Sequence, residues 1–236
     1  MLRWALQLHK WIALVVGLQV LFWVGGGLVM TSIPIGKVRG EHHAKPVDNG
    51  PIPLASVLSP AEIVAKSGFK EPNEAILKAT PQGPIWVLRS ARGSEGYYAA
   101  TTGDDVRELT PAEASKAAAS GFTGAGKPIR STLLDDVVPE EADATAPLFR
   151  VDFDDRDHTS LYLDAFTGEV LSRRSDTWRF YDFFWRLHAM DWKTGNNFNH
   201  PLIIITTAVT LFMVLTGFVL LWIRLARDLA TVRTKK

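Results

Sequence analysis

The sequence contains no cysteine. Without thiols the chain cannot form disulfides, bind a cysteine-ligated iron–sulfur cluster, attach c-type haem covalently or use a thiol nucleophile. The absence does not decide the compartment, because a domain with a sufficiently large core is stable without disulfides. The 236 residues are enough for one medium-sized domain or two small ones in addition to membrane segments.

Charged residues are missing from two long stretches. None occurs from Trp11 to Gly36, and none from Thr194 to Ile223. About 20 apolar residues in a helix cross the hydrocarbon core of a bilayer, so we predict transmembrane helices over 11–33 and 200–223. The first stretch exceeds the apolar region of a secretory signal peptide, and "GGGLVMTS" offers no clear cleavage site. We therefore interpret it as an uncleaved anchor.

The charges at the two ends predict the orientation. Of the 26 Lys and Arg residues, two precede the first stretch and five follow the second, where only Asp228 opposes them. Basic residues next to membrane spans mark the cytoplasmic side, so segments 1–10 and 224–236 are predicted to be cytoplasmic. The intervening loop is net acidic and is predicted to lie in the periplasm, beyond a bacterial inner membrane. It has no basic stripe, which argues against nucleic acid as a partner.

The loop contains an internal repeat. "SPAEIVAKSGF" from Ser59 resembles "TPAEASKAAASGF" from Thr110, and each places a capping residue, a proline and a glutamate at a helix start. "YYAATTGDDVREL" (97–109) likewise resembles "LYLDAFTGEVLSRR" (161–174), with a Thr-Gly turn between apolar strands. We predict an α+β domain of two units, 54–109 and 110–175, each a helix followed by about three antiparallel strands. The second unit has an insertion near 124–147.

Two further segments connect these parts. Residues 34–53 are rich in Pro and Gly and are predicted to be a linker. In 176–193 the residues Trp178, Tyr181, Trp185, His188 and Trp192 recur at spacings of three and four. That spacing places them on one helix face, and Trp and Tyr favour the headgroup region. We predict an interfacial amphipathic helix before the second span.

Several of these segments resemble the PepSY-associated transmembrane family. "LHKWIALVVGLQVLFWVGGGLVM" and "VRGEH" look like its first helix and the segment after it. "LFRVDFDDRDHTSLYLDAFTGEVL" looks like the strands of a PepSY unit, and "RLHAMDW" with the last apolar stretch looks like its final helix. The resemblance implies two PepSY-like units in a periplasmic domain. Larger relatives include haem-binding ferric-siderophore reductases, and PepSY units also occur in propeptides that are thought to inhibit peptidases.

The histidines at the membrane edges are the candidate site residues. His9, His188 and His200 are interpreted as possible axial ligands of haem b iron, with Gln19 lining the site. Snorkelling or interfacial hydrogen bonding explains them equally well. His9 and His200 are separated by about 30 Å of bilayer, so they cannot share one iron. A bis-His site therefore requires a homodimer, pairing His9 with its copy, or His188 with His200.

Two functional hypotheses follow. In the first, haem b carries electrons to a periplasmic acceptor such as ferric iron or a siderophore, with a second copy or another membrane redox subunit as partner. In the second, the chain is a non-enzymatic anchored module that binds or inhibits a partner such as a peptidase. The sequence contains no H-E-x-x-H or G-x-S-x-G motif that would indicate a hydrolase. We favour the first hypothesis slightly, because the histidines occur beside small and polar helix faces.

Overall fold

The computed structural model describes residues 2–47, 49–193, 195 and 197–234. Contacts divide the chain into two compact bodies. The helical body consists of Met1–Pro34 and Phe180–Lys236, and the globular body consists of Ile35–Arg179. Each body is described by itself below.

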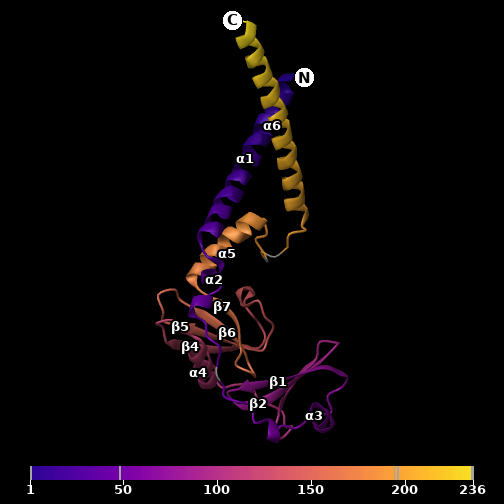
Figure 1. Ribbon diagram of the computed structural model, residues 1–236, viewed down its shortest axis with the longest axis vertical. Helices are drawn as coiled ribbons and strands as arrows, with labels where there is room; N and C mark the ends of the chain where they lie inside the picture. Colours follow the sequence, from indigo (N-terminus) through magenta and orange to yellow (C-terminus); the bar gives the residue numbers. More distant parts are fainter. Residues whose placement is uncertain (1, 48, 194, 196, 235–236) are drawn as a thin grey trace. The chain divides into compact units, whose positions relative to one another are not determined.

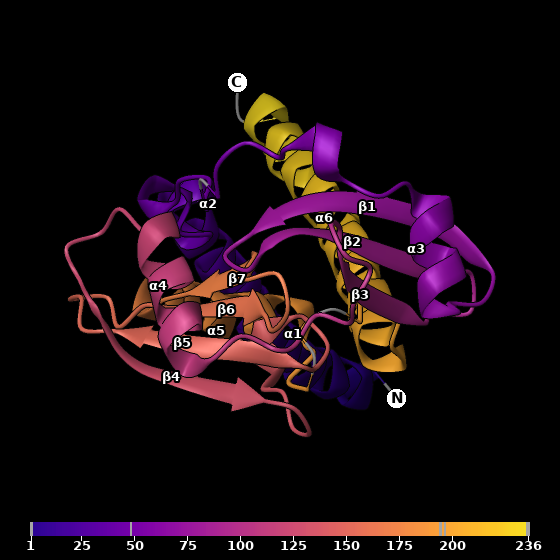
Figure 2. The ribbon, with the colours of Figure 1, turned by 90° about the horizontal axis from the view of Figure 1, so that it is seen from below.

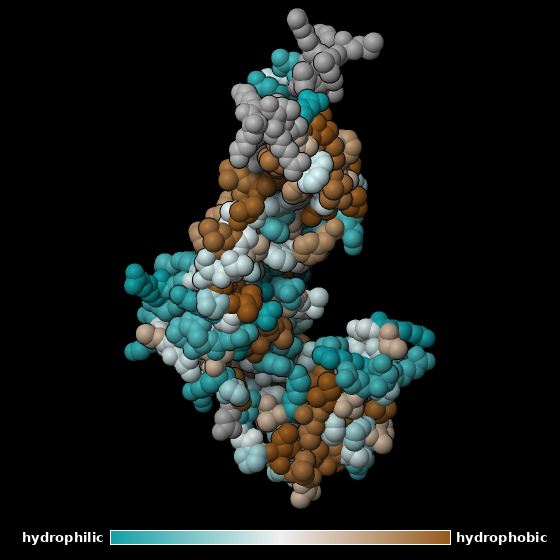
Figure 3. All heavy atoms as spheres, turned by 45° about the horizontal axis from the view of Figure 1, so that its top comes forward, coloured by the Kyte–Doolittle hydropathy of each residue, from teal (hydrophilic) through white to brown (hydrophobic). Residues whose placement is uncertain are grey.

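The helical body is built around two long apolar helices, α1 (Leu2–Ser32) and α6 (Pro201–Thr234), drawn in indigo and yellow in Figure 1. Within them, Lys10–Ser32 and Pro201–Arg227 are long and apolar enough to cross a membrane. Their most apolar windows are only 6% and 0% buried. Figure 3 shows apolar residues in brown over the surface of these helices. So much exposed apolar surface is unfavourable in water and favourable in lipid.

Both helices extend beyond the predicted spans of 11–33 and 200–223. Helix α1 begins nine residues earlier, at Leu2, and α6 continues to Thr234. The added segments carry the basic residues that flank the spans, and they contain good helix formers such as Leu, Ala, Gln, Arg and Lys. The apolar pattern indicates only the part of a helix that lipid can cover. Backbone hydrogen bonds continue the helix beyond that part, into the flanking residues.

Helix α5 (Asp176–Ala189) occupies most of the segment predicted as an interfacial helix. It is shorter than 176–193, because Met190 adopts a positive φ of 55° that ends the helix. Trp178, Tyr181 and Trp185 therefore share the helix with His188, while Trp192 lies beyond its end. An ion pair between Arg186 and Asp182, 2.7 Å apart and one turn away, supports the helix internally.

The globular body contains two antiparallel sheets, each with a helix, as Figure 2 shows. The first sheet has the order β1-β2-β3, with β1 (Pro72–Thr80), β2 (Gly83–Ser90) and β3 (Glu95–Ala99), and is preceded by α3 (Pro60–Ser67). The second has the order β4-β5-β6-β7, with β4 (Pro128–Leu134), β5 (Leu148–Phe153), β6 (Ser160–Asp164) and β7 (Val170–Arg174), and is preceded by α4 (Pro111–Gly121). The chain is therefore of the α+β class.

The repeat seen in the sequence recurs in local geometry. Both α3 and α4 begin with a complete capping box, formed by Ser59 with Glu62 and by Thr110 with Glu113. Both Thr-Gly turns place glycine at positive φ, 80° at Gly103 in the first half and 70° at Gly168 in the second half. The strand counts differ, because residues after Gly103 form only an isolated bridge at Asp105 where the second half forms β7.

The insertion predicted near 124–147 supplies an edge strand. Strand β4 pairs with β5 as β1 pairs with β2, and each first pair has a register irregularity at its proline end. The rest of the insertion holds the short 3₁₀ helix η3 (Glu140–Ala142), whose Ala142 is completely buried beside Leu148 and Tyr162. The second half is thus a four-stranded sheet with a covered rear face.

Each half has its own hydrophobic core. In the first half, Ile63 of α3 packs against Leu88 and Tyr98 of the sheet. In the second half, the small residues Ala114, Ala117 and Ala118 of α4 allow close approach to the buried strand residues, which include Phe149, Val151, Leu161 and Leu163. A helix covering one face of a sheet is how an amphipathic strand pattern becomes buried.

Specific contacts join the two halves. The Leu109 amide donates to the Ala165 carbonyl at 2.8 Å, and the Gln82 side chain donates to the carbonyl oxygens of Arg107 and Phe166. Tyr97 stacks on Phe166 with ring centroids 4.3 Å apart. Burial is the main cause that raises the pKa of Tyr97 above its ordinary value. These contacts fix the relative position of the two sheets within the globular body.

The segment predicted as a linker, 34–53, lies against the second half. It contains the short helix α2 (Ile35–Val38) and the 3₁₀ helix η1 (Glu41–His43), and η2 (Leu54–Ser56) follows it. Ala44 forms a bridge with Phe122, and the Lys45 amide donates to the Gly121 carbonyl at 3.1 Å. The segment then continues past the junction of the halves, where it forms part of a cavity wall.

Candidate functional site

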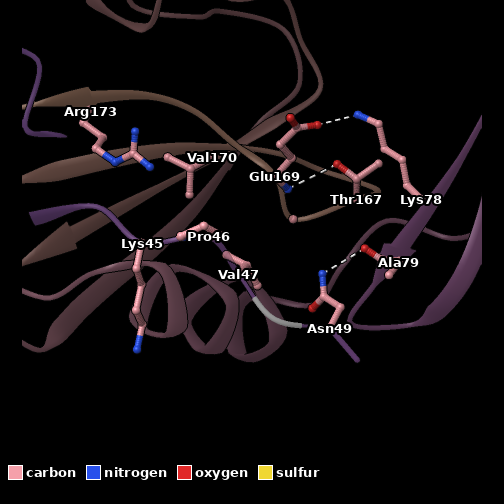
Figure 4. A pocket seen from close by; sticks show the side chains of 11 residues that line it. Lys45, Pro46, Val47, Asn49, Lys78, Ala79, Thr167, Glu169, Val170 and Arg173 are labelled. Carbon is pink, nitrogen blue, oxygen red and sulfur yellow. Dashed lines mark hydrogen bonds and ion pairs between the residues drawn. The ribbon is translucent and has the colours of Figure 1, made fainter. Parts of the chain in front are cut away.

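A cavity of about 430 Å³ lies in the globular body where the two halves meet (Figure 4). Three distant parts of the chain line it: residues 45–47 with Asn49, the end of β1 at Lys78 and Ala79, and the turn and strand residues 167–170 with Arg173. Strands β1 and β7 are the edges of their sheets, so two sheet edges border the same space. A cavity of this volume is within the usual range of small-molecule sites.

Arg173 is the cation at one side of this cavity. Its Nε is buried and has no hydrogen-bond partner in the described part of the chain. Burial lowers the pKa of Arg173, and Glu41 acts in the opposite direction through its charge. The arginine side chain packs on Gly40, where an added Cβ would lie 3.4 Å from the Arg173 Cβ. Gly40, at φ 67°, thus lies beside the aliphatic part of the Arg173 side chain.

The opposite side of the cavity is polar but balanced in charge. The Lys78 ammonium forms an ion pair with the Glu169 carboxylate, and the amide of Glu169 donates to the Thr167 hydroxyl at 3.2 Å. The Asn49 amide donates to the Ala79 carbonyl at 2.9 Å, so it closes the exposed edge of β1. Between the two sides, Val47 and Val170 provide apolar wall, as Figure 4 shows.

In the helical body, His188 lies in the last turn of α5 and packs against α1. Its carbonyl oxygen accepts a hydrogen bond from Trp23 Nε1 at 2.9 Å, and its Nδ1 is buried without a partner among the described residues. Gly26 lies at this contact: an added Cβ there would be 3.4 Å from the Phe184 oxygen and 4.0 Å from His188 Nδ1. The glycine run of the first span is thus a packing surface at Gly26, where His188 meets it.

His200 stands immediately before α6 and caps it. Its Nδ1 accepts a hydrogen bond from the Ile203 amide at 3.5 Å, and its Nε2 lies 3.2 Å from the Ala189 carbonyl oxygen. These two contacts fit a neutral imidazole with its proton on Nε2. Both ring nitrogens therefore have local partners, and metal ligation by His200 would require the loss of one of these bonds.

Gln19 lines an apolar groove of about 540 Å³ formed by residues of α1 and α6 together with Met190. Its Nε2 is buried and has no hydrogen-bond partner in the described part of the chain. Phe22, Leu202 and Thr206 are among its neighbours in the groove wall. An unpartnered amide in an apolar setting is costly, so the position favours a ligand or a second helix.

The structure brings two of the predicted haem ligands together and leaves the third apart. His188 and His200 both lie next to Ala189, at the same end of the two long helices. His9 lies in the first turns of α1, about 25 Å along the helix axis from Gly26 at 1.5 Å per residue. The side chain of His9 falls outside the described part of the structure. Among the described residues, no group of three or more His, Cys, Asp or Glu forms a metal site.

Sequence reasoning missed the residues of the cavity. Lys45, Lys78 and Arg173 lie in three separate segments, and nothing in their local patterns distinguishes them from other surface cations. Trp23, which binds the His188 carbonyl, was also not singled out. The one available signal was the pair of Thr-Gly turns, since Thr167 and Gly168 lie in the cavity wall.

Two exposed apolar helices and a mixed helix-and-sheet body define a membrane-anchored α+β protein. A family model describes the class more narrowly: the PepSY-associated TM region matches residues 6–236. The chain belongs to this family, which confirms the resemblance noted in the sequence. It has no significant match among curated proteins and none among solved structures.

Proposed function

We propose that the protein is an inner-membrane binding module whose two PepSY-like units lie in the periplasm and bind a ligand or a partner there. The cavity at the junction of the two halves carries this proposal. It combines solvent access, an apolar wall and a partly buried arginine whose Nε has no hydrogen-bond partner among the described residues. Such a combination is expensive to maintain in a domain whose role is purely structural.

The proposed orientation rests on charge. Lys10 precedes the first apolar stretch, Arg224 and Arg227 follow the second, and the described globular body between them carries abundant acidic residues. Both ends of the chain are then cytoplasmic and the globular body is periplasmic.

The absence of cysteine makes this orientation testable with single-cysteine variants. Lys116 is exposed on α4, and Gln7 is exposed near the start of α1. In cells with a permeabilised outer membrane, a membrane-impermeant maleimide should label Lys116→Cys at once and Gln7→Cys only after lysis. Labelling of Gln7→Cys in intact cells, with Lys116→Cys protected, would overturn the proposed orientation.

Haem b-dependent electron transfer is the second candidate function. Two buried polar atoms without described partners, Gln19 Nε2 and His188 Nδ1, favour it. Because the contacts of His200 are satisfied locally, we propose that two copies of the chain supply the ligands, with His9 or His188 facing its counterpart. Haem b, when bound, would supply one-electron transfer. The residues of this chain would hold the ring within the helices and exclude water from it.

An absorption spectrum decides this second candidate. Full-length protein purified in mild detergent, after expression with added haem precursor, should show a Soret band that shifts on reduction with dithionite. Either His9→Ala or His188→Ala should lose the band, whichever histidine pairs with its copy, and His42→Ala serves as the control because His42 lies in η1 of the globular body. A colourless wild-type protein, unchanged by dithionite, would rule out the haem hypothesis and leave the binding module untouched.

A further inference from the structure

The cavity of the globular body has an asymmetric arrangement of charge that specifies a ligand. Lys45, Lys78, Arg173 and Glu169 are its charged lining residues. Lys78 is neutralised by Glu169, and Figure 4 shows the Lys45 ammonium pointing away from the other labelled side chains. Arg173 feels the charge of Glu41 but forms no close ion pair with any described carboxylate, so it is the cation left to face the cavity among the described residues. One anionic group on the ligand would match it.

The guanidinium of Arg173 selects the kind of anion. Arginine presents a planar set of N–H donors that pairs bidentately with carboxylate or phosphate. Its Nε lacks a described acceptor but is out of reach of solvent, so the terminal guanidinium nitrogens are the donors that a carboxylate in the cavity would meet. The aliphatic part of the side chain lies beside Gly40.

The rest of the cavity argues against a simple inorganic anion. Val47 and Val170 form apolar wall next to the arginine, which favours carbon attached to the anionic group. The far side offers the Lys78–Glu169 ion pair and the Asn49 amide, which together present both donors and acceptors with no net charge. Neutral amide groups match that side, whereas a second carboxylate would be repelled by Glu169.

We propose that this cavity binds short peptide acids or related amide-bearing monocarboxylates, with the carboxylate on Arg173 and the amide groups toward Lys78, Glu169 and Asn49. The assignment deepens the proposed binding function and rests on it. The expected ligand has a single carboxylate at the end of an amide-containing chain, and it is small enough to fit a cavity of about 430 Å³.

The experiment is a calorimetric titration of the full-length protein in nanodiscs with acetyl-dialanine as the free acid. Its C-terminal amide, glutarate and inorganic phosphate are titrated in parallel. We expect saturable one-to-one binding of the peptide acid, and binding at least tenfold weaker for each of the other three. A tenfold loss corresponds to removal of one charge-assisted hydrogen-bonded pair.

Arg173→Gln tests the role of the arginine, and Arg130→Gln on the exposed face of β4 is the matched control. Arg173→Gln should weaken the binding of the peptide acid at least tenfold, and Arg130→Gln should leave its affinity unchanged. Because Arg173→Gln removes a desolvated charge, its melting temperature without ligand should equal or exceed that of the wild type. This readout separates lost binding from lost folding.

Three results would overturn the proposal: no saturable binding of the peptide acid to the wild type, equal binding of acid and amide, or unchanged affinity in Arg173→Gln. Phosphate binding as tight as the peptide acid would also overturn it, because simple charge attraction would then suffice. None of these results bears on the cysteine labelling, so failure of the ligand assignment is distinguishable from failure of the proposed orientation.

Discussion

Arg179, in the first turn of α5, is the centre of a polar network within the globular body that includes Glu141 of η3 and Tyr162 of β6. Its guanidinium lies 3.1 Å from one Glu141 oxygen and 3.3 Å from Asp176. Glu141 also accepts a hydrogen bond from the Tyr162 hydroxyl at 2.7 Å. Replacing Arg179 with methionine removes the cation and leaves Glu141 with Tyr162 as its main described partner.

The size of the effect follows from distance and exposure. At 3.1 Å and an effective dielectric constant of about 20, the attraction is about 5 kcal/mol before desolvation is counted. The two side chains are 33% and 22% exposed, so the pair lies between surface pairs, worth about 0–1 kcal/mol, and buried pairs, which cost about 3–5 kcal/mol to break. We expect Arg179→Met to lower the free energy of unfolding by about 2 kcal/mol.

Thermal unfolding of the full-length protein in nanodiscs, followed by near-ultraviolet circular dichroism, is the assay. A loss of about 2 kcal/mol lowers the melting temperature of a domain of this size by about 4–8 °C. Arg130→Met, on the exposed face of β4, should change it by less than about 1 °C. Equal melting temperatures for both variants would refute the assigned role of Arg179.

The dependence of stability on pH tests the same network a second time. Burial raises the pKa of Glu141, but hydrogen bonds from Arg179 and Tyr162 outweigh it and leave the pKa below its ordinary value. The folded state therefore gains stability from this carboxylate above its unfolded pKa and loses it as the pH falls through the folded pKa. The difference in stability between wild type and Arg179→Met should shrink as the pH falls below about 4.

The other predictions concern the repeated turns and two charged pairs. Gly168→Ala should destabilise the protein more than Gly103→Ala. At Gly168 the added Cβ would meet buried Leu109 and Ala117 at 3.2 and 3.3 Å, whereas at Gly103 the nearest atom belongs to the flexible Lys66 side chain. The melting temperature of Gly168→Ala should therefore be the lower of the two. The Arg107 hydrogen bonds lower the pKa of Glu113 to about 2, so the stability difference between wild type and Glu113→Gln should be present at pH 7 and lost between about pH 4.5 and 2; equal differences at pH 7 and pH 2 would contradict this. The hydrogen bond to Asp176 raises the pKa of His158, so its contribution is present below the ordinary histidine pKa and lost as the pH rises through the raised value; melting curves of His158→Gln at pH 5 and pH 8 measure it.

Local sequence signals predicted the parts of the fold that depend on local chemistry. The capping residues Ser59 and Thr110 start α3 and α4, and the Thr-Gly turns place glycines at positive φ. Each of these features is decided by a few adjacent residues. The two apolar stretches gave the long helices for the same reason, since continuous absence of charge is itself the signal.

Features that depend on distant segments were not predictable. The cavity forms only because residues 45–47 and Asn49, the end of β1 and the turn before β7 meet at the junction of the halves. The sequence indicates only that 124–147 contains an insertion, yet this segment supplies β4, whose pairing with β5 completes the sheet. The contact of His200 Nε2 with the Ala189 carbonyl oxygen depends on where Ala189 lies in space, which no sequence spacing specifies.

The most direct test of the central claim uses the cavity wall itself. Val47→Cys places one thiol in a chain without cysteine, beside Val170 in the wall of the cavity. In cells with a permeabilised outer membrane, an impermeant maleimide should label this thiol, and a saturating concentration of acetyl-dialanine should slow the labelling. Labelling of Lys116→Cys should be insensitive to the peptide. Labelling of Val47→Cys only after lysis, or at the same rate with and without peptide, would contradict a periplasmic cavity that binds peptide acids.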